Sequence, residues 1–318
     1  MQNAVLKPVL VDEGRYIMML VVGATGLLGG DVTRRLLDQG RQVRILVRHK
    51  SPSEALAPQG MATSAQSLIE RGAQPVYGDL KDPASLDRVL EGIDTVITTA
   101  NSAMRSGDDN PETVEMSGNR NLVEAARKAG VKYFIFISAK SADIASPVPF
   151  LAGKGQAEEA LKSSGIPYTI LAPNAFMESW IAMIVGIPVV TGQPVTVVGS
   201  GERKHSFVSR GDVAAFTMAA VDNPQAINQR LVIGGSEPLS FRDAAKIFEK
   251  ILSQEIPVHS VPPGTLLPGL PETESLLAAT FDQYDSPDEM NELTQKYSLT
   301  LTPLEQFARG MLAAAGKI

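Results

Sequence analysis

The stretch MLVVGATGLLGG, residues 19–30, decides the fold of this 318-residue chain. Its apolar first part is of strand length and leads directly into glycines spaced Gly-x-x-Gly-x-x-Gly. Apolar residues then recur at helical spacing up to Leu37, and Gly40 marks the end of that helix. The pattern predicts a strand over Ile17–Val22, a tight turn and a helix. A second predicted strand, Gln42–Arg48, completes a βαβ unit.

The same alternation of strands and helices continues to Pro173. Predicted helices begin at Asp82 and at about Gly155, and another covers Glu112–Ala129. The further predicted strands are Gln74–Tyr77, Thr95–Thr99, Lys132–Ser138 and Pro167–Leu171. Strands that alternate with helices indicate an α/β fold, with a parallel sheet covered by helices on both faces.

The pattern changes after Pro173, where prolines and short predicted strands such as Val195–Val198 and Arg230–Ile233 become frequent. Ser240 is predicted to cap a helix, and the segment TPLE, residues 302–305, is predicted to form a capping box with proline at the first helical position. We interpret this part of the chain as a smaller lobe that covers a substrate.

The composition excludes several classes of protein. A net charge of −6 and a pI near 5.3 leave no basic footprint for direct nucleic-acid contact. The chain has no cysteine, and its 3 histidines are scattered, so we expect neither disulfides nor a metal site. His205 is expected to be a loop or strand residue. No apolar run reaches the ~20 residues that span a bilayer, and no signal peptide is recognisable, so we expect a cytoplasmic protein without membrane contact.

The glycines are predicted to cradle the phosphates of a dinucleotide. Gly23 permits the turn, Gly26 lets backbone N–H groups approach a pyrophosphate, and Gly29 lets the helix pack closely on the strand. The positive end of the helix dipole then faces the phosphates. A tight turn without a ligand is the alternative. The other predicted contacts of this loop are Thr25, Leu27 and Leu28.

The end of the second predicted strand indicates which dinucleotide binds. NAD sites usually have Asp or Glu there, whereas this chain has Arg48, with Lys50 close behind. A guanidinium can hold a 2′-phosphate through paired hydrogen bonds, so NADP(H) is favoured over NAD(H). Further cofactor contacts are predicted after the third and fourth strands, at Asp79, Leu80, Thr99, Ala100 and Asn101.

These features resemble the atypical short-chain dehydrogenase/reductases, specifically the NmrA-like branch with isoflavone-reductase-like and quinone-reductase-like members. The resemblance covers about residues 18–260, and its main motifs are GATGLLG (23–29), LVR (46–48), YGDL (77–80), SGIPYTIL (164–171), PNAFME (173–178) and GDVA (211–214). It implies a Rossmann doubly wound parallel sheet, a smaller C-terminal substrate-binding lobe and NADPH as hydride donor. We therefore expect an extension over 1–16, an NAD(P)-binding Rossmann domain over 17–173, and over 174–318 mainly the substrate-binding lobe, with segments near 205–235 returning to the Rossmann domain.

The catalytic residues depart from the common pattern of the resembled group, which is a serine followed by Tyr-x-x-x-Lys. Here Ser138 and Lys154 are present, but Phe150 stands in the position of the tyrosine. Since NmrA-like members commonly lack this tyrosine and keep a lysine, the resemblance implies that Lys154 binds the nicotinamide ribose and assists proton movement. Ser138 and Lys154 are thus the predicted catalytic residues and also cofactor contacts. An exposed pair of Lys154 with Glu158, one helical turn on, is the alternative. Pro173, Asn174 and Phe176 are the remaining predicted cofactor contacts.

We expect an NADPH-dependent reductase that transfers hydride to a conjugated small molecule of quinone, enone or aromatic type. The alternatives are an NmrA-like regulatory protein that senses NADP without turnover and, disfavoured by the missing tyrosine, a sugar-nucleotide epimerase or dehydratase. The expected partner is an apolar or aromatic small molecule, and the sequence leaves a homodimer open. The polar loop 102–111 could serve as a lid or as a partner surface, and the sequence does not choose between the two.

Overall fold

The computed structural model describes residues 17–48, 63–103, 105, 107–270 and 272–318. The predicted extension over 1–16 and the predicted cofactor contact Lys50 lie outside these residues. The chain divides into two compact units. The first runs to Ala172 and includes Ala214–Leu231, and the second consists of Pro173–Val213 and Val232–Ile318. The predicted bounds of the Rossmann domain and of the substrate-binding lobe stay predictions.

The first unit is built on a sheet with strand order β3-β2-β1-β4-β5-β6-β8. Its strands are β1 (Met18–Val22), β2 (Gln42–Val47), β3 (Gln74–Tyr77), β4 (Thr95–Thr98), β5 (Tyr133–Ile137), β6 (Tyr168–Pro173) and β8 (Gln229–Ile233). Neighbouring strands from β3 to β6 pair in parallel. Met19, Leu20 and Val21 of β1 are fully buried in the middle of this sheet. The predicted Rossmann-like parallel sheet is therefore confirmed.

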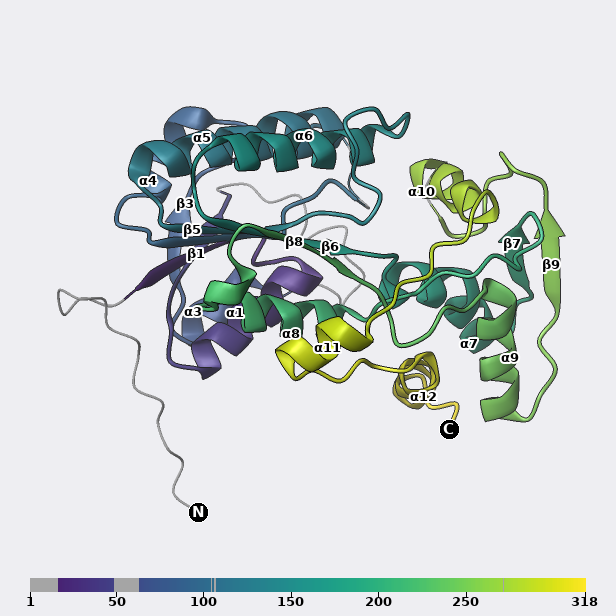
Figure 1. Cartoon of the computed structure of the whole chain (residues 1–318). Helices are drawn as coiled ribbons and strands as arrows, with labels where there is room; N and C mark the ends of the chain where they lie inside the picture. Colours follow the sequence, from purple (N-terminus) through teal and green to yellow (C-terminus); the bar gives the residue numbers. More distant parts are fainter. Residues whose placement is uncertain (1–16, 49–62, 104, 106, 271) are drawn as a thin grey trace, which may run out of the picture. The chain divides into compact units, whose positions relative to one another are not determined.

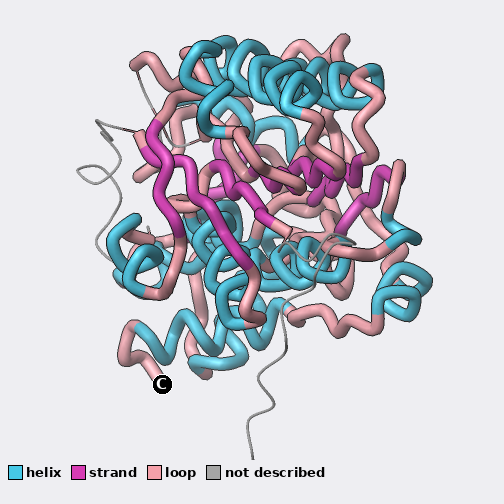
Figure 2. The backbone as a smooth tube through the Cα atoms, turned by 90° about the vertical axis from the view of Figure 1, so that its left-hand side faces the viewer, coloured by secondary structure: helices cyan, strands magenta, loops and turns pink. Residues whose placement is uncertain are grey.

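Helices cover both faces of the sheet (Figure 1). One face carries α4 (Pro83–Val89), α5 (Asn119–Ala129) and α6 (Pro149–Ser163), and the other carries α1 (Leu27–Asp38), α3 (Ala65–Glu70) and α8 (Arg210–Ala220). Figure 2 shows the strands as a magenta layer with helices on either side. A short 3-10 turn, Pro224–Ala226, precedes β8. On the face of α4, α5 and α6, leucines, valines and alanines of these helices form an apolar core with the sheet.

Two helices of this unit differ from the prediction. The segment expected to be one helix begins as a π-helix, η1 (Pro111–Gly118), and becomes α-helical only at Asn119. Asn110 starts η1, since its side chain accepts hydrogen bonds from two backbone N–H groups and Thr113 returns one. Helix α6 begins at Pro149 rather than near Gly155, because proline at the first helical position already has helical φ.

The second unit packs short elements around its own apolar core. They are η2 (Met177–Gly186, a π-helix), α7 (Ile187–Thr191), β7 (Val195–Val198), α9 (Phe241–Leu252), β9 (Val258–Val261), α10 (Glu272–Ala278), the 3-10 helix η4 (Ala279–Asp282), α11 (Asn291–Tyr297) and α12 (Leu304–Ala314). Strands β7 and β9 pair in parallel.

The two predicted helix caps of the second unit have different outcomes. Ser240 caps α9 in a capping box with Asp243, as predicted. The predicted capping box at residues 302–305 is wrong, because Pro303 is the cap residue of α12 and no side chain caps this helix. Thr302 instead donates its hydroxyl and its backbone N–H to the Asp212 carboxylate, both at 2.9 Å.

Candidate functional site

The predicted cofactor residues of the first unit follow the carboxyl ends of parallel strands. Gly23 follows β1, Arg48 follows β2, Asp79 lies just beyond β3, Thr99 follows β4 and Ser138 follows β5. Parallel strands end at one edge of the sheet, and the strand order reverses between β1 and β4. Ligands of open α/β sheets bind in the crevice at such a reversal. The fold thus brings these five residues to the same edge.

The glycine turn fits the approach of a phosphate to the backbone. Gly23 has φ of +83°, in the left-handed region that favours glycine. A Cβ at Gly29 would lie 2.2 Å from the Gly23 carbonyl oxygen, so the first turn of α1 packs directly on the loop. Gly26 is the N-cap of α1 and supplies no side chain to cap the first-turn N–H groups, which lack intrahelical acceptors. Leu27 is exposed, and Thr25 and Leu28 are half-buried.

The loop after β4 is tied to the glycine turn. Thr99 is buried, and its hydroxyl donates to the Gly23 carbonyl oxygen at 3.3 Å. Asn101 donates its side-chain amide to the Thr99 carbonyl at 3.2 Å. The carbonyl of Ala100 accepts a hydrogen bond from Lys154 Nζ at 3.3 Å. The loops after β1 and β4 are therefore fixed to each other where the strand order reverses.

The side chain of Arg48 meets an unexpected carboxylate, that of Asp109. Arg48 Nη1 donates to both Asp109 oxygens, at 2.9 and 2.7 Å. Lys81 Nζ donates to Asp109 Oδ1 at 2.7 Å and Arg105 Nη1 to Oδ2 at 3.2 Å. Burial raises the pKa of the Asp109 carboxyl, but the hydrogen bonds and charges of Lys81 and Arg48 outweigh this and lower it to about 2. We call Arg48, Lys81 and Arg105 the cation cluster.

Asp79 and Leu80 shape the turn after β3. Asp79 Oδ1 accepts the backbone N–H of Lys81 at 2.9 Å, and Oδ2 lies 3.2 Å from Lys81 Nζ. The Asp79 carboxylate therefore holds one member of the cation cluster. Leu80 is buried in the apolar core, and its carbonyl accepts a hydrogen bond from the Asn121 side chain at 3.0 Å. Leu80 thus anchors this turn to α5.

Ser138 belongs to a buried polar chain with Glu158 and Arg230. The Ser138 hydroxyl donates to Glu158 Oε1 at 2.5 Å, and Arg230 Nε on β8 donates to Glu158 Oε2 at 2.8 Å. Glu158 is 3% exposed, so its charge is balanced by Arg230 and by Lys162, whose Nζ lies 3.6 Å from Oε2, rather than by water. The guanidinium also donates to the carbonyl of Ala139 at 3.0 Å. The sequence did not single out Arg230, which is 72 positions from its partner.

Lys154 lies behind the strand ends and is 2% exposed. Its ammonium donates to the carbonyls of Ile137 at 3.0 Å and Ala100 at 3.3 Å, and so joins the ends of β5 and β4. Burial lowers the pKa of Lys154, and the charges of Glu115 and Glu158 oppose this. The alternative of an exposed pair with Glu158 is wrong, because both side chains are buried.

Phe150 stands where a tyrosine acid would be expected, and its ring faces the ammonium of Lys154. Lys154 Nζ lies 5.0 Å from the ring centroid of Phe136 and 5.8 Å from that of Phe150, so both rings contribute to the surroundings of the buried cation. A phenyl ring has no proton to donate. The arrangement therefore stabilises the lysine without supplying an acid at residue 150.

Glu115 on η1 is a buried residue that the sequence did not indicate. It is fully buried, and its Oε1 accepts the backbone N–H of Ser102 at 2.7 Å. Within the described residues its Oε2 has no hydrogen-bond partner. Burial raises the pKa of Glu115, against the opposing effects of the Lys154 charge and the Ser102 hydrogen bond. No local pattern separates Glu115 from the surface carboxylates of the helix predicted there.

Three predicted cofactor contacts belong to the second unit, namely Pro173, Asn174 and Phe176. Pro173 ends β6, and Phe176 is the N-cap of η2. The Asn174 amide donates to the Ser286 carbonyl and to Asp288 Oδ2, both at 2.8 Å. These contacts hold the segment after β6 within its own unit. The cofactor contacts expected of the three residues stay predictions.

His205 is a core residue of the second unit. It is 1% exposed, and its Nε2 lies 2.9 Å from the carbonyl oxygen of Phe281, so Nε2 carries a proton. Its Nδ1 lies 2.7 Å from the Ser286 hydroxyl. The rings of Phe207, Phe281 and Tyr284 stand edge-on around the imidazole. The histidine therefore holds an aromatic cluster together.

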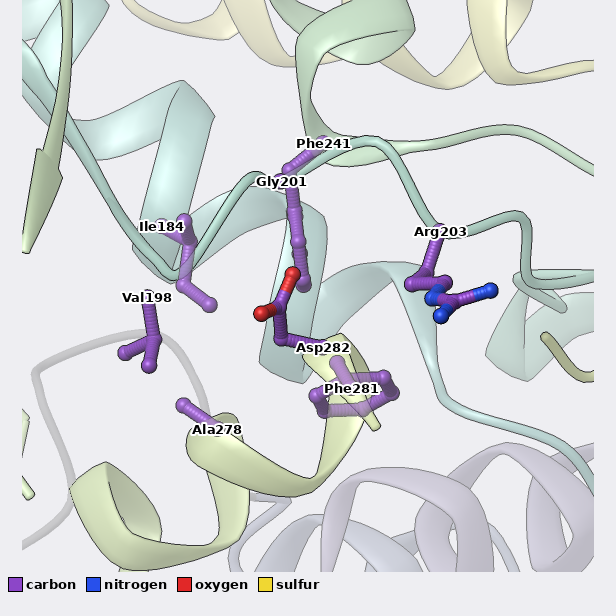
Figure 3. Close-up of a pocket in the computed structure, with 8 residues that line it drawn as sticks. All are labelled: Ile184, Val198, Gly201, Arg203, Phe241, Ala278, Phe281 and Asp282. Atoms are coloured by element: carbon purple, nitrogen blue, oxygen red, sulfur yellow. The ribbon is translucent and has the colours of Figure 1, made fainter. Parts of the chain in front are cut away.

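A small hollow beside this cluster is shown in Figure 3. Its walls include Ile184, Val198 and Phe241. Its charged lining residues are engaged with neighbours: Asp282 accepts the backbone N–H of Ser200 at 2.9 Å, and Arg203 donates to an aspartate at 3.1 Å. The hollow is best explained as a packing feature.

Two searches of the described ranges concern other kinds of site. No helix in them has the length and apolar character needed to cross a membrane. No group of three or more His, Asp or Glu side chains in them is arranged to hold a metal ion.

The chain belongs to the NmrA-like family, whose family profile matches residues 17–308. The photosystem II assembly factor Ycf39 of Trieres chinensis is 31% identical over 245 residues, which are 77% of this chain and 72% of that protein. An NAD(P)H azoreductase of Xenophilus azovorans is 30% identical over 228 residues, 72% of this chain and 71% of that one.

Solved structures confirm the fold. The NADPH-dependent quinone oxidoreductase of Escherichia coli, crystallised with NADPH, superposes with a TM-score of 0.75 at 21% identity. The superposition covers 93% of this chain and 100% of that chain. The chain is thus similar in sequence to proteins named as an assembly factor and an azoreductase, and it shares its fold with a quinone oxidoreductase.

Proposed function

We propose that this protein binds NADPH at the carboxyl ends of its first-unit strands and reduces a conjugated small molecule. Three features of the first unit fit the dinucleotide. The glycine turn offers backbone N–H groups for a pyrophosphate, the loops after β1 and β4 are fixed at the sheet reversal, and the cation cluster suits a 2′-phosphate. The azoreductase and the quinone oxidoreductase support the reaction class, since both are reductases by name.

The roles of the two units follow from this proposal. The first unit, with its strand-end residues, is the NAD(P)-binding Rossmann domain. The second unit, with its apolar and aromatic core, is the substrate-binding lobe, and Pro173, Asn174 and Phe176 are its residues that contact the cofactor.

The single observation that carries the proposal is the buried Lys154 beside the Ser138–Glu158–Arg230 chain. When bound, NADPH supplies a hydride. Lys154 is held by two strand-end carbonyls at the edge where the glycine turn lies. The Ser138 hydroxyl donates a hydrogen bond to Glu158. Its oxygen is therefore left to accept a hydrogen bond, and the serine does not act as an acid. Lys154 is thus the group proposed to orient the ribose and move a proton.

The missing tyrosine limits the substrate. Because Phe150 supplies no proton, the acceptor must give a reduced product that is stable as an anion until water or Lys154 protonates it. Quinones, enones and azo or related aromatic compounds meet this requirement, since conjugation spreads the negative charge.

Steady-state oxidation of NADPH against quinones, azo dyes and enones tests the proposal. Lys154→Ala should lower kcat by ~10²–10⁴ if Lys154 moves the proton, or weaken NADPH binding if it only orients the ribose. Lys128→Ala, at an exposed lysine of α5, is the matched control and should leave both quantities unchanged. Phe150→Tyr should not be required for turnover. Wild-type rates in Lys154→Ala would remove Lys154 from the mechanism.

A second candidate is an NADP-binding regulatory or assembly protein without turnover. The similarity to the Ycf39 assembly factor favours it, as does the absence of a tyrosine acid. Under this proposal NADPH binds, yet no acceptor in the panel is reduced. Reduction of any acceptor in the panel, abolished by Gly26→Val, would exclude this second candidate.

A further inference from the structure

We propose that Asp109 occupies the place of the cofactor's 2′-phosphate and thereby weakens the preference for NADPH over NADH. The proposal rests on the proposed function, because it concerns the same dinucleotide site. It makes Asp109 a specificity-determining residue, opposed in effect to Arg48. Neither the glycine motif nor the strand-end arginine indicates this residue.

The first argument is the geometry of the cation cluster. Three side chains from three separate segments converge on one carboxylate, with donor–acceptor distances between 2.7 and 3.2 Å. Arg48 follows β2, Lys81 follows β3, and Arg105 lies after β4. Their donors surround Asp109, whose side chain is only 11% exposed. Such a set of donors is what an oxyanion with several acceptor oxygens requires.

The second argument is the position of the cluster in the fold. Arg48 stands where dinucleotide sites recognise the 2′ substituent of the adenosine ribose. A 2′-phosphate carries more negative charge than a carboxylate and presents three acceptor oxygens. It would use the same donors as Asp109. Two anions that share one set of cations repel each other, so the phosphate must displace the Asp109 carboxylate or bind beside it at a cost.

The third argument concerns how Asp109 is held. The next residue, Asn110, caps η1 through two backbone N–H groups, and the carbonyl of Asp108 accepts the Thr113 hydroxyl at 2.6 Å. The backbone on both sides of Asp109 is therefore anchored to the start of η1. The carboxylate is presented to the cation cluster by a fixed backbone, and rotation of its side chain alone would release the three cations.

The test compares Asp109→Asn with Asp108→Asn. Both remove one negative charge at neighbouring positions, but Asp108 is exposed. Removing a competing charged acceptor should tighten NADPH binding in Asp109→Asn by about tenfold and leave NADH unchanged. Asp108→Asn should have little effect. The same comparison with 2′,5′-ADP and 5′-AMP, measured by calorimetry, isolates the phosphate.

A second variant tests whether the gain depends on the cation cluster. Lys81→Met should weaken NADPH and 2′,5′-ADP but not NADH, and the gain from Asp109→Asn should shrink in the double variant. Weaker NADPH binding in Asp109→Asn would show that Asp109 positions Arg48 and would overturn the proposal. Equal effects of the two Asp→Asn changes would also overturn it. If NADPH binds to neither wild type nor variants, the proposed function fails, whereas unchanged but measurable NADPH binding refutes only the role of Asp109.

Discussion

Arg48 and Asp109 lie 61 positions apart in the sequence, and Arg48 donates to both oxygens of the Asp109 carboxylate. Two opposing demands meet at Asp109. Its charge stabilises the folded chain by compensating three cations, and the same charge competes with a phosphate. Removing the charge of Asp109 is therefore expected to lower the stability of the folded chain and to raise its affinity for the phosphate.

The stability side of this exchange depends on pH. The pKa of Asp109 is about 2 in the folded protein, below its ordinary value of 3.8, so the contribution of its charge to stability is fully present above pH 4 and is lost as the pH falls through 2. We expect Asp109→Asn to lower the unfolding free energy at pH 7 by about 2 kcal/mol. The difference from wild type should shrink between pH 4 and pH 2. Urea unfolding at pH 7, 5 and 3 measures it, and a difference that grows on acidification would contradict the assignment.

The residue-scale predictions made from sequence depend on local position. Arg48, Asp79 and Thr99 could be predicted because each ends or follows a predicted strand, and parallel strands end at one edge. Asp109 and Arg230 could not, because their partners are distant in sequence and no periodic pattern records such pairs. The roles assigned to these residues await the binding measurements.

The elements that carry the site are held by close packing at glycines. A Cβ at Gly26 would meet only the Gly23 carbonyl oxygen, at 3.2 Å, whereas a Cβ at Gly29 would approach that atom to 2.2 Å. The two glycines of one motif therefore answer to different constraints. Gly29 is required by the fold, whereas under the proposed function Gly26 is required by the ligand.

Substitution separates these two constraints. Gly26→Val should abolish NADPH binding while thermal unfolding stays close to that of wild type, because a branched side chain would fill the approach to the backbone. Gly29→Ala should lower the unfolding temperature even without cofactor. Differential scanning fluorimetry with and without NADPH checks both. NADPH binding retained by a folded Gly26→Val variant would show that the glycines serve only the turn.

The contact between η1 and α6 also rests on a glycine. A Cβ at Gly153 would lie 2.6 Å from the Glu115 Cβ, so the two helices must separate to accept it. Gly153→Ala should therefore destabilise the protein by about 1–3 kcal/mol. Gly310→Ala is the matched control, because Gly310 lies in helix α12 with nothing within 4 Å of its ideal Cβ, and it should stabilise by roughly 0.5–1 kcal/mol. Denaturant unfolding of both variants measures the two changes in stability, and equal effects would refute the packing argument.

At the element scale, regular patterns were predictable and irregular ones were not. The strands of the first unit lie within one or two residues of their predicted bounds, because apolar runs next to turn residues define them. The π-helical start of η1 was missed, since apolar spacing does not distinguish it from an α-helix over two turns. Strand β9 was also missed, because its end residues are only half-buried and its middle residues are exposed.

Over the whole chain, each compact unit is made of two segments that are separated in the sequence. The first unit is completed by Ala214–Leu231, after the chain has passed through part of the second. The first unit could be predicted largely because its strands and helices alternate. The second could be predicted only in part, since β7 and β9 pair across about sixty residues that include α8, β8 and α9. The domain boundaries themselves stay a prediction.

The late arrival of β8 has a consequence for synthesis on the ribosome. β8 pairs with β6, but the chain between them must be translated first, which takes roughly 3–11 s at 5–20 residues per second. During that interval the edge of β6 is unpaired, and buried Glu158 has not yet met Arg230. An open apolar edge is a template for pairing with another chain. The emerging polypeptide is therefore most exposed to aggregation, and most in need of a chaperone, between the release of β6 and the release of β8 from the exit tunnel.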